Sequence, residues 1–383
     1  MARIYLDNNA TTPLDPEVRE AMQPYLGERF GNPSSNHREG EAARHGIEQA
    51  RGQVAGLIKA PAGRLFFTSG GTESNNLAIF SASGAAPDKK HILASLVEHD
   101  SVRAPLRYLR DRFGYEIEWL AVDNSGGLDL DRLQKAIRPD TVLVSLMAAN
   151  NETGVVWPMA EIGAICRRQG VLLHCDAVQL AGKAPLDVEA MGIDYLALAG
   201  HKLHGPKGSG ALYARRGAPL SPLIHGAGQE GGMRSGTENV PGIVGFGAAC
   251  ELAARHLGAM KQCILEMRQR LEEGLRAAIP DSLINGAGQP RLYNTVNVSF
   301  AGCASGALIQ ELDERGIEVS AHSACHGGDL NPSHVLSAMG VPEIFLHGTL
   351  RLSLSRFNTM AEVETLLKIL PQIVEKSRRQ AAG

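Results

Sequence analysis

The sequence predicts an α/β protein with a mostly parallel sheet, followed by a smaller α+β unit. Short apolar runs alternate with amphipathic stretches over most of the chain, a pattern typical of parallel strands joined by helices. Near residue 258 a long charged amphipathic stretch begins and the alternation changes. The 383 residues are sufficient for two hydrophobic cores. We therefore predict a large domain over residues 13–257 and a small domain made of residues 1–12 and 258–383.

Individual elements follow from the same patterns. Strands of the large domain are predicted at residues 64–68, 91–95, 141–147, 171–174, 195–198 and 210–213, with helices at 73–81 and 160–168. In the small domain, helices are predicted at residues 259–278, 307–314 and 360–374, and strands at 294–300, 317–320 and 350–354. Residues that follow a buried strand lie at the carboxyl end of the sheet, where α/β enzymes place their ligands.

Composition excludes several classes of function. Apolar residues make up 44% and charged residues 21% of the chain, as in an ordinary globular protein. The formal net charge of −3 provides no basic field for a nucleic acid. The first residues lack the apolar core of a signal peptide, and no uninterrupted apolar run reaches the ~18 residues of a membrane span. We expect a cytoplasmic protein that contacts neither nucleic acid nor membrane.

The six cysteines differ in their sequence surroundings. None forms a C-x-x-C pair, so the sequence does not support a zinc site or a dithiol centre. Apolar periodic segments, which predict buried and unreactive thiols, contain Cys166, Cys175, Cys250 and Cys263. Cys325 instead lies in a small, polar, glycine-rich segment between His322 and His326. An exposed thiol beside histidines is a candidate nucleophile.

Residues 68–76 form the first candidate ligand site. A predicted strand ends here, Gly70 and Gly71 permit close approach of the backbone, and Thr72 stands at the start of a helix. Such a turn presents free N–H groups and the positive end of the helix dipole to an anion, typically a phosphate. An ordinary helix start capped by Thr72 or Ser69 explains this segment, taken alone, at least as well.

Two charged residues follow neighbouring predicted strands. Asp176 comes directly after a buried apolar run, and a carboxylate there can keep a pyridinium nitrogen protonated. Lys202 follows the next apolar run among glycine and histidine, where a lysine with a lowered pKa can form a Schiff base. Taken singly, Asp176 could cap a helix and Lys202 could be solvated. Together with the anion-binding turn, the pair predicts pyridoxal 5'-phosphate as the cofactor.

Eight motifs then occur in one order along the chain. They cover residues 5–12, 31–35, 67–76, 150–155, 174–179, 200–202, 234–241 and 323–325. In this order they closely resemble the cysteine desulfurases of the NifS/IscS type, in class V of the pyridoxal-phosphate-dependent aminotransferase family. The resemblance extends from residue 4 to about residue 365. It implies the type I fold of these enzymes, with a seven-stranded, mostly parallel sheet flanked by helices and a small domain that carries the catalytic cysteine.

The resemblance also implies a role for each matching residue. The catalytic residues would be Lys202, which binds the cofactor as a Schiff base, His99, which stacks on its ring, and Cys325, which accepts sulfur. Asp176 would pair with the pyridine nitrogen and Gln179 with the ring hydroxyl. Further contacts to the cofactor are implied for Gly71, Thr72, Asn151, His201 and, from the other subunit of a homodimer, Thr237. Contacts to the substrate are implied for Asn8, Asn32, Asn151 and Arg351, where Arg351 would clamp the carboxylate in preference to Arg356.

The implied reaction converts L-cysteine to L-alanine and leaves sulfur on Cys325 as a persulfide. An acceptor protein such as an iron–sulfur scaffold would then take the sulfur for iron–sulfur clusters or other sulfur-containing biomolecules. No resident metal is predicted; only a contact between Cys325 and an iron–sulfur cluster during transfer is left open. The alternatives are a selenocysteine lyase, a class V aminotransferase and a non-enzymatic scaffold for sulfur transfer. The sequence departs from the family pattern at Ala199, where relatives commonly have a serine, and at residues 326–329.

Overall fold

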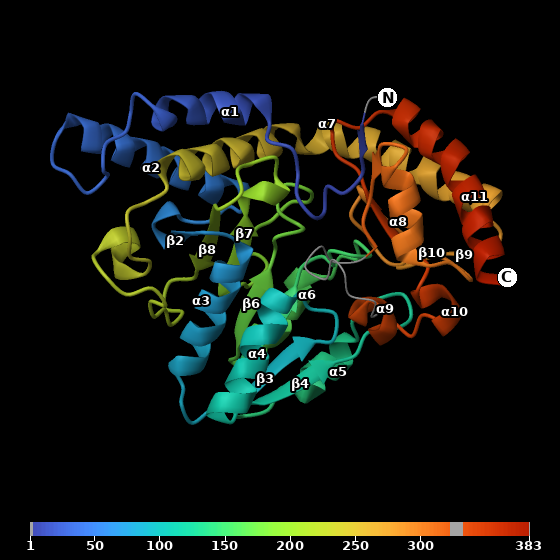
Figure 1. Cartoon of the computed structure of the whole chain (residues 1–383). Helices are drawn as coiled ribbons and strands as arrows, with labels where there is room; N and C mark the ends of the chain where they lie inside the picture. Colours follow the sequence, from blue (N-terminus) through green and yellow to red (C-terminus); the bar gives the residue numbers. More distant parts are fainter. Residues whose placement is uncertain (1–2, 322–331, 383) are drawn as a thin grey trace.

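The larger part of the molecule is built around one sheet. The computed structural model describes residues 3–321 and 332–382, and its central sheet has seven strands in the order β2-β8-β7-β6-β5-β3-β4 (Figure 1). The strands are β2 (Leu65–Thr68), β3 (His91–Ser95), β4 (Glu116–Leu120), β5 (Thr141–Met147), β6 (Leu172–Asp176), β7 (Tyr195–Ala199) and β8 (Gly210–Ala214). All pairs from β7 to β4 are parallel, whereas β8 is antiparallel to both β7 and β2. The predicted α/β fold with a mostly parallel sheet of seven strands is confirmed.

The strands that precede candidate site residues all end at one edge of this sheet. Because β2 is antiparallel to β8, and β8 is antiparallel to β7, β2 runs in the same direction as β7 and the other parallel strands. The carboxyl ends of β2, β3, β5, β6 and β7 therefore lie on the same side. This is the side on which ligands of α/β proteins bind.

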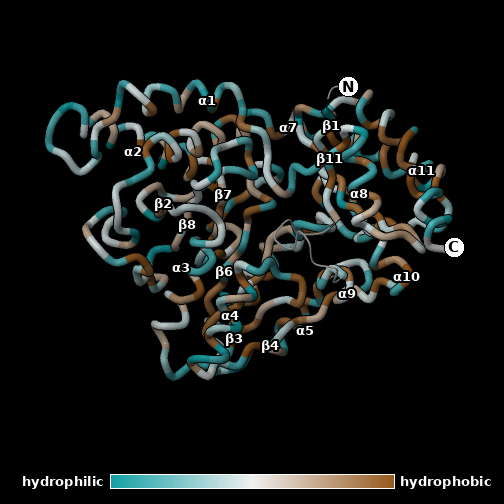
Figure 2. The backbone as a smooth tube through the Cα atoms, viewed as in Figure 1, coloured by the Kyte–Doolittle hydropathy of each residue, from teal (hydrophilic) through white to brown (hydrophobic). Residues whose placement is uncertain are grey.

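Helices cover both faces of the sheet (Figure 1). On one face, α3 (Gly71–Gly84) and α4 (Asp100–Phe113) share a core with the sheet. On the other face, α2 (Arg38–Leu57), α6 (Met159–Gln169) and part of α7 (Val240–Ala278) share a larger core with it. Side chains along β7 alternate between the two cores, with Tyr195 in the first and Leu196 in the second. In Figure 2 the loop beyond α2 is mostly teal, whereas much of the sheet is brown.

A separate core lies beyond the carboxyl edge of the sheet. Its strands are β9 (Ser282–Ile284), β10 (Thr295–Phe300) and β12 (Thr349–Ser353), with the short pair β1 (Ile4–Tyr5) and β11 (Ile317–Glu318). Its helices are α8 (Ser305–Asp313), α11 (Met360–Ala382) and the end of α7. The remaining short helices are α1 (Pro16–Met22), α5 (Leu130–Ala136), α9 (His334–Ala338) and α10 (Glu343–Leu346). The strands and helices predicted after residue 258 are present, but the helix predicted at residues 259–278 begins at Val240, and the one predicted at 360–374 continues to Ala382.

α7 connects the two parts of the molecule across the top of Figure 1. Only its second half was predicted from the sequence, because the first half lacks a charged stripe and packs closely on α2. A Cβ atom on Gly247 would lie 2.5 Å from the Cα atom of Ala50, so the glycine permits this approach. Asn239 caps the helix start by accepting a hydrogen bond from the N–H of Gly242. The domain boundary predicted between residues 257 and 258 falls inside this helix and stays a prediction.

The cysteines confirm the predicted burial with one exception. Cys166, Cys175 and Cys250 are buried, and burial raises the pKa of the Cys166 thiol to about 12. The prediction was wrong for Cys263, which is exposed. The buried stripe of this part of α7 contains Ile264, Met267, Leu271 and Leu275, and Cys263 lies on a different face of the helix. Cys325 lies outside the described residues.

The chain start passes between the two parts of the molecule. After β1, the backbone N–H of Asn8 donates to the carbonyl of Ser353, and that of Thr12 donates to the carbonyl of His201.

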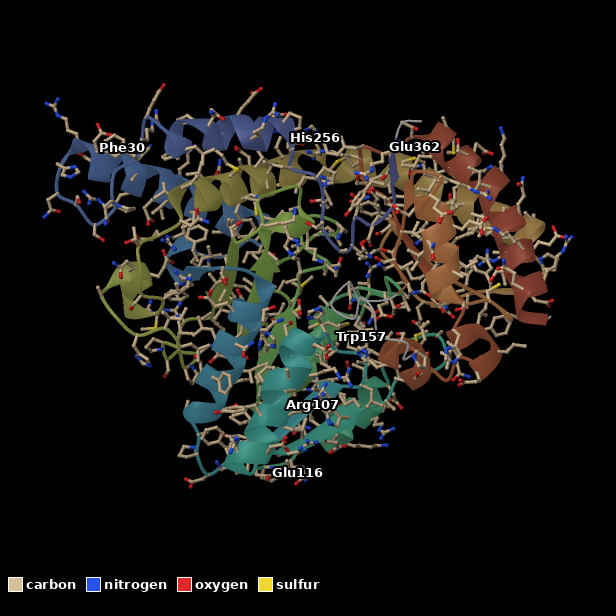
Figure 3. All side chains as sticks on the ribbon, in the orientation of Figure 1. Phe30, Arg107, Glu116, Trp157, His256 and Glu362 are labelled. Atoms are coloured by element: carbon tan, nitrogen blue, oxygen red, sulfur yellow. The ribbon has the colours of Figure 1, made fainter. Side chains whose placement is uncertain are left out.

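In Figure 3, Trp157 lies near the middle of the molecule and Phe30, which is 78% exposed, lies at the outer end beyond α2. Within residues 3–321 and 332–382, no helix has both the length and the apolar composition required to cross a bilayer.

Candidate active site

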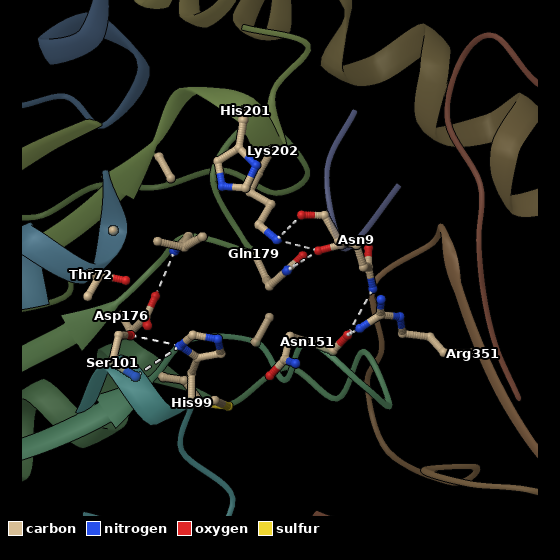
Figure 4. Close-up of a pocket in the computed structure, with 16 residues that line it drawn as sticks. Asn9, Thr72, His99, Ser101, Asn151, Asp176, Gln179, His201, Lys202 and Arg351 are labelled. Atoms are coloured by element: carbon tan, nitrogen blue, oxygen red, sulfur yellow. Dashed lines mark hydrogen bonds between the residues drawn. The ribbon is translucent and has the colours of Figure 1, made fainter. Parts of the chain in front are cut away.

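A cavity of about 200 Å³ opens at the carboxyl edge of the sheet (Figure 4). It is lined by Asn9, Ala10, Gly71, Thr72, His99, Ser101, Met147, Ala149, Asn151, Asp176, Val178, Gln179, Ala199, His201, Lys202 and Arg351. The structure thus brings together most of the residues that were singled out in the sequence. The lining residues from Gly71 to Lys202 lie at or just after the carboxyl ends of strands of the large sheet. Arg351 lies on β12, and Asn9 and Ala10 lie near the start of the chain.

The start of α3 forms one end of the cavity and is suited to an anion. No side chain caps this helix, since its N-cap is Gly70, so the capped start considered for this segment is not what forms. The φ angle of Gly70 is +156°, and a Cβ atom on Gly71 would lie 2.7 Å from Cγ2 of Val178. Both positions therefore require glycine, which leaves the N–H groups of the first turn open to a ligand.

His201 lines the same cavity as the start of α3. Its Nδ1 atom lies 3.2 Å from the hydroxyl of Thr11. Burial, together with the positive charges of three nearby lysines, lowers the pKa of His201 to about 4. The imidazole is therefore neutral at pH 7 and can offer a hydrogen bond, but no charge, at this end of the cavity.

Asp176 is held in place by a chain of buried hydrogen bonds. One carboxylate oxygen accepts from the N–H of Val178 (3.0 Å) and the other from Nδ2 of Asn75 (2.8 Å). Because Asn75 donates through Nδ2, its oxygen is an acceptor, and His174 must donate to it through Nε2 (3.0 Å). Nδ1 of His174 then accepts from the hydroxyl of Ser145 (2.8 Å). A chain of hydrogen bonds through Asn75, His174 and Ser145 therefore holds the carboxylate of Asp176 from behind.

His99 is fixed on the opposite side of the cavity. As the N-cap of α4, its Nδ1 atom accepts from the N–H of Ser101 (3.1 Å) and lies 2.8 Å from the hydroxyl of the same residue. The Ser101 hydroxyl in turn accepts from Nδ2 of Asn75. Asn75 thus links the ring of His99 to the carboxylate of Asp176. Neither Asn75 nor Ser101 was identified from the sequence, although Asn75 lies in one of the motifs.

Lys202 reaches the cavity from the short turn after β7. Its Nζ atom donates to the carbonyl oxygens of Asn9 (2.5 Å) and Ala10 (2.7 Å). The carbonyl of Asn9 also accepts from Nε2 of Gln179 (3.0 Å). Asn9 was missed in the sequence, where its neighbour Asn8 was chosen instead. In a loop without a regular period, the sequence gives no signal that separates two adjacent asparagines.

Arg351 lies on the side of the cavity that faces the second core. It is 1% exposed, and its guanidinium donates to Oδ1 of Asp7 (2.6 Å) and to the carbonyl of Asn151 (3.2 Å). Its Nε atom is buried and has no hydrogen-bond partner within the described part of the chain. Arg356, the alternative carboxylate ligand, pairs with Asp15 and lines a different cavity. The guanidinium at the cavity is therefore that of Arg351.

Three predicted site residues lie elsewhere in this chain. Asn8 is buried behind the cavity, where its Nδ2 atom donates to the carbonyl of Ser353 (2.8 Å). Asn32 and Thr237 are exposed and do not line the cavity. Asn32 uses its side-chain oxygen to accept from the N–H of Ser34. Their assigned contacts stay predictions, as does the role of Cys325, which lies outside the described residues.

Solved structures share this fold and this arrangement of the chain. A NifS-like protein superposes with a TM-score of 0.91 at 38% identity, over 98% of this chain and 100% of that one. SspA in complex with cysteine superposes with a TM-score of 0.81 at 36% identity, over 93% of this chain and 100% of that one. The architecture is therefore that of the NifS-like proteins.

Comparison of the amino-acid sequence with family models and with known proteins identifies the family of this chain. The model of the class V aminotransferases matches residues 4–366. Cysteine desulfurase 2 of Trichormus variabilis is 49% identical over 378 residues, which cover 99% of this chain and 94% of that protein. The chain belongs to the class V aminotransferase family, in the group that contains the cysteine desulfurases. The resemblance inferred from the motifs is thereby confirmed.

The carboxyl group of Glu98 gives a prediction about stability. Burial raises the pKa of Glu98 to about 8, and the charge of Asp176 acts in the same direction. A carboxyl whose pKa is higher in the folded state binds its proton more tightly there, so this group destabilises the fold as pH rises from about 4.5 to about 8. We expect Glu98→Gln to match the wild-type melting temperature at pH 5.5 and to exceed it by roughly 2–5 °C at pH 9.

Calorimetry at both pH values tests this expectation. Glutamine keeps the oxygen that accepts from the hydroxyl of Ser95 (2.6 Å) and the N–H of Met147 (3.0 Å). Glu273→Gln, at an exposed position on α7, is the control and should show the same difference from wild type at both pH values. A Glu98→Gln variant whose difference from wild type does not change with pH would contradict the assignment of a neutral carboxyl.

Proposed function

We propose that this protein is a pyridoxal-phosphate-dependent cysteine desulfurase that converts L-cysteine to L-alanine and takes the sulfur onto Cys325. The observation that carries the proposal is that Lys202, Asp176 and the uncapped start of α3 face one cavity, in a chain of this family. The proposal includes a homodimer, a cytoplasmic location and a sulfur-acceptor protein such as an iron–sulfur scaffold.

The residues present fit pyridoxal phosphate group by group. The first turn of α3, with Gly71, Thr72 and neutral His201, suits the phosphate. Asp176, braced by Asn75, suits the protonated ring nitrogen. Lys202 suits covalent attachment of the aldehyde. When bound, the cofactor supplies an electron sink for the charge that develops at the α-carbon of an amino acid.

The other residues of the cavity would bind and orient the substrate. Among the described residues, Nε of Arg351 is buried without a hydrogen-bond partner, and a guanidinium with free donors binds a carboxylate in a fixed orientation. Lys202, when not attached to the cofactor, would remove and return a proton at the α-carbon. His99 has its Nδ1 atom occupied by Ser101, so its proton is on Nε2. This fixes the tautomer of the imidazole at the cavity wall.

The two chain segments that flank Cys325 support its role as sulfur acceptor. Before residues 322–331, the N–H of Arg351 donates to the carbonyl of Ser320 (2.6 Å), next to the proposed carboxylate clamp. After them, the hydroxyl of Ser333 donates to a carboxylate oxygen of Glu152 (2.5 Å), the neighbour of Asn151. The segment that contains Cys325 is therefore attached at both ends beside the cavity.

The proposed sulfur transfer is balanced without an additional reactant. The thiolate of Cys325 attacks the sulfur of the bound cysteine, and the Cβ–S bond of the substrate breaks as the S–S bond forms. The electron pair of the broken bond remains with the substrate carbon, which is protonated to give alanine. Sulfur is oxidised to the persulfide level while the substrate carbon is reduced. The sum is L-cysteine plus a thiol giving L-alanine plus a persulfide.

Attachment of the cofactor to Lys202 can be tested directly. The purified protein should be yellow, and Lys202→Ala should lose the absorbance band of the covalently bound cofactor because no other lysine lines the cavity in the described part of the chain. Borohydride reduction followed by peptide mapping should place the label on Lys202. A label on Lys183 or Lys207 would contradict the assignment.

Replacement of the thiol separates the desulfurase from an aminotransferase. Cys325→Ser should bind pyridoxal phosphate and cysteine as the wild type does. Because the nucleophile is lost, its rate of sulfide release should fall by about 100-fold or more. Alanine and sulfide are measured together after addition of cysteine and a reductant. Cys303→Ser, at a buried position of the second core, is the control and should behave as the wild type. Substantial turnover by Cys325→Ser would rule out the mechanism.

The homodimer is tested through Thr237. This residue is exposed in the single chain, and the proposal places its hydroxyl on the phosphate of the partner subunit. Thr237→Val should therefore leave the dimer intact by light scattering and weaken cofactor binding by about tenfold, the loss of one hydrogen bond to a charged group. A monomeric wild type with full cofactor occupancy would refute the assembly.

A further inference from the structure

Gln179 has an amide whose orientation is determined by its two partners. Its Nε2 atom donates to the carbonyl of Asn9 (3.0 Å), and a carbonyl can only accept. Its Oε1 atom lies 3.3 Å from Nζ of Lys183, and an ammonium can only donate. Both contacts require the same assignment of the amide, with the oxygen toward Lys183 and the N–H₂ group on the opposite side. Gln179 itself and Asn9, the partner of the N–H₂ group, both line the cavity described above (Figure 4).

Lys183 contacts Gln179 at two points. Besides the side-chain oxygen, Nζ donates to the backbone carbonyl of Gln179 at 3.0 Å. The two residues are four positions apart in the segment that follows β6, so the ammonium closes a short loop around the amide. The backbone and the side chain of Gln179 are thus held by one cation.

Lys183 is not placed to form the Schiff base itself. It does not line the cofactor cavity but a smaller one of about 50 Å³ behind it, which Lys202 and Asn8 also line. This cavity is large enough for water, and Oδ1 of Asn8 is a buried acceptor without a partner in the described part of the chain. Burial, together with the charge of Lys202, lowers the pKa of Lys183 to about 7. The amino group is therefore only partly protonated at pH 7, but it keeps N–H donors in both protonation states, and its hydrogen bonds are directed to Gln179.

We propose that Lys183 is a positioning residue that holds the amide of Gln179 with its N–H₂ group toward the ring oxygen of pyridoxal phosphate. The inference rests on the proposed function, since it concerns the cofactor assigned there. If Lys183 were absent, only the hydrogen bond to the carbonyl of Asn9 would hold the amide, and the side chain could turn away from the ring oxygen. The effect on cofactor binding would then pass entirely through Gln179.

A double-mutant cycle tests whether the effect passes through Gln179. Lys183→Met removes the ammonium and keeps an unbranched side chain, and Gln179→Leu removes the amide. Apoprotein of the wild type, both single variants and the double variant is titrated with pyridoxal phosphate, and the dissociation constant is measured by absorbance. We expect each single variant to bind about tenfold more weakly and the double variant to bind no more weakly than Gln179→Leu alone.

A second measurement distinguishes positioning from general destabilisation. The pH at which the absorbance of the bound cofactor changes reports on hydrogen bonding to its ring, so Lys183→Met and Gln179→Leu should shift it in the same direction. Lys135→Met, at an exposed position on α5, is the matched control and should change neither quantity. If Lys183→Met does not fold, Lys183→Gln takes its place in the cycle.

The outcomes separate this inference from the function on which it rests. Additive losses in the double variant, or a shift of the absorbance transition in only one single variant, would overturn the role of Lys183 while the proposed cofactor stands. A wild type that takes up no pyridoxal phosphate would overturn the proposed function and the inference with it. Non-additive binding with matching spectral shifts supports both.

Discussion

The site is held together by the hydrogen bonds of residues 7–12, which run between the two parts of the molecule. The carboxylate of Asp7 holds the guanidinium of Arg351, and the carbonyl of Asn9 holds the ammonium of Lys202. Thr12 donates through both its N–H and its hydroxyl to the carbonyl of His201. These contacts join the strand end after β7 to strand β12 of the second core. The distance between the side chains of Lys202 and Arg351 is therefore set by one short segment.

Behind the cavity, the protein controls charge by burial. Burial lowers the pKa of His174 to about 4 and raises that of Glu98 to about 8, so both are neutral at pH 7. The charge of Asp176 contributes to the shift at Glu98, as expected when two carboxyl groups share a poorly solvated region. The neutral groups serve as hydrogen-bonding supports, and Asp176 is the acidic side chain that lines the cavity. Two acidic side chains thus have different roles because their surroundings differ.

The sequence predicted the parts of this site that follow from regular structure. Asp176 and Lys202 could be identified because each follows an apolar strand, and parallel strands end at one edge of a sheet. Asn9 could not be separated from Asn8, because the choice depends on a loop whose path is set by contacts more than 100 positions away in the sequence, such as that with Lys202. The first half of α7 was missed for a related reason. Its surface is made of small apolar residues that pack on α2, and burial on several sides removes the periodic pattern that reveals an amphipathic helix.

The number of residues between Cys325 and the described residues on either side limits how far the Cys325 thiol can reach. Cys325 is four residues after Ala321, and four residues of extended chain span at most about 14 Å. Ala321 follows Ser320, which is hydrogen bonded to the backbone of Arg351, so this reach is measured from the proposed carboxylate clamp itself. On the other side, eight residues separate Cys325 from Ser333, which allows about twice that distance. The thiol can go no farther from Ala321 than the shorter connection allows, whatever the length of the longer one. On the proposed function, a partner that takes sulfur from Cys325 must therefore come within this reach of Arg351, at the cavity itself.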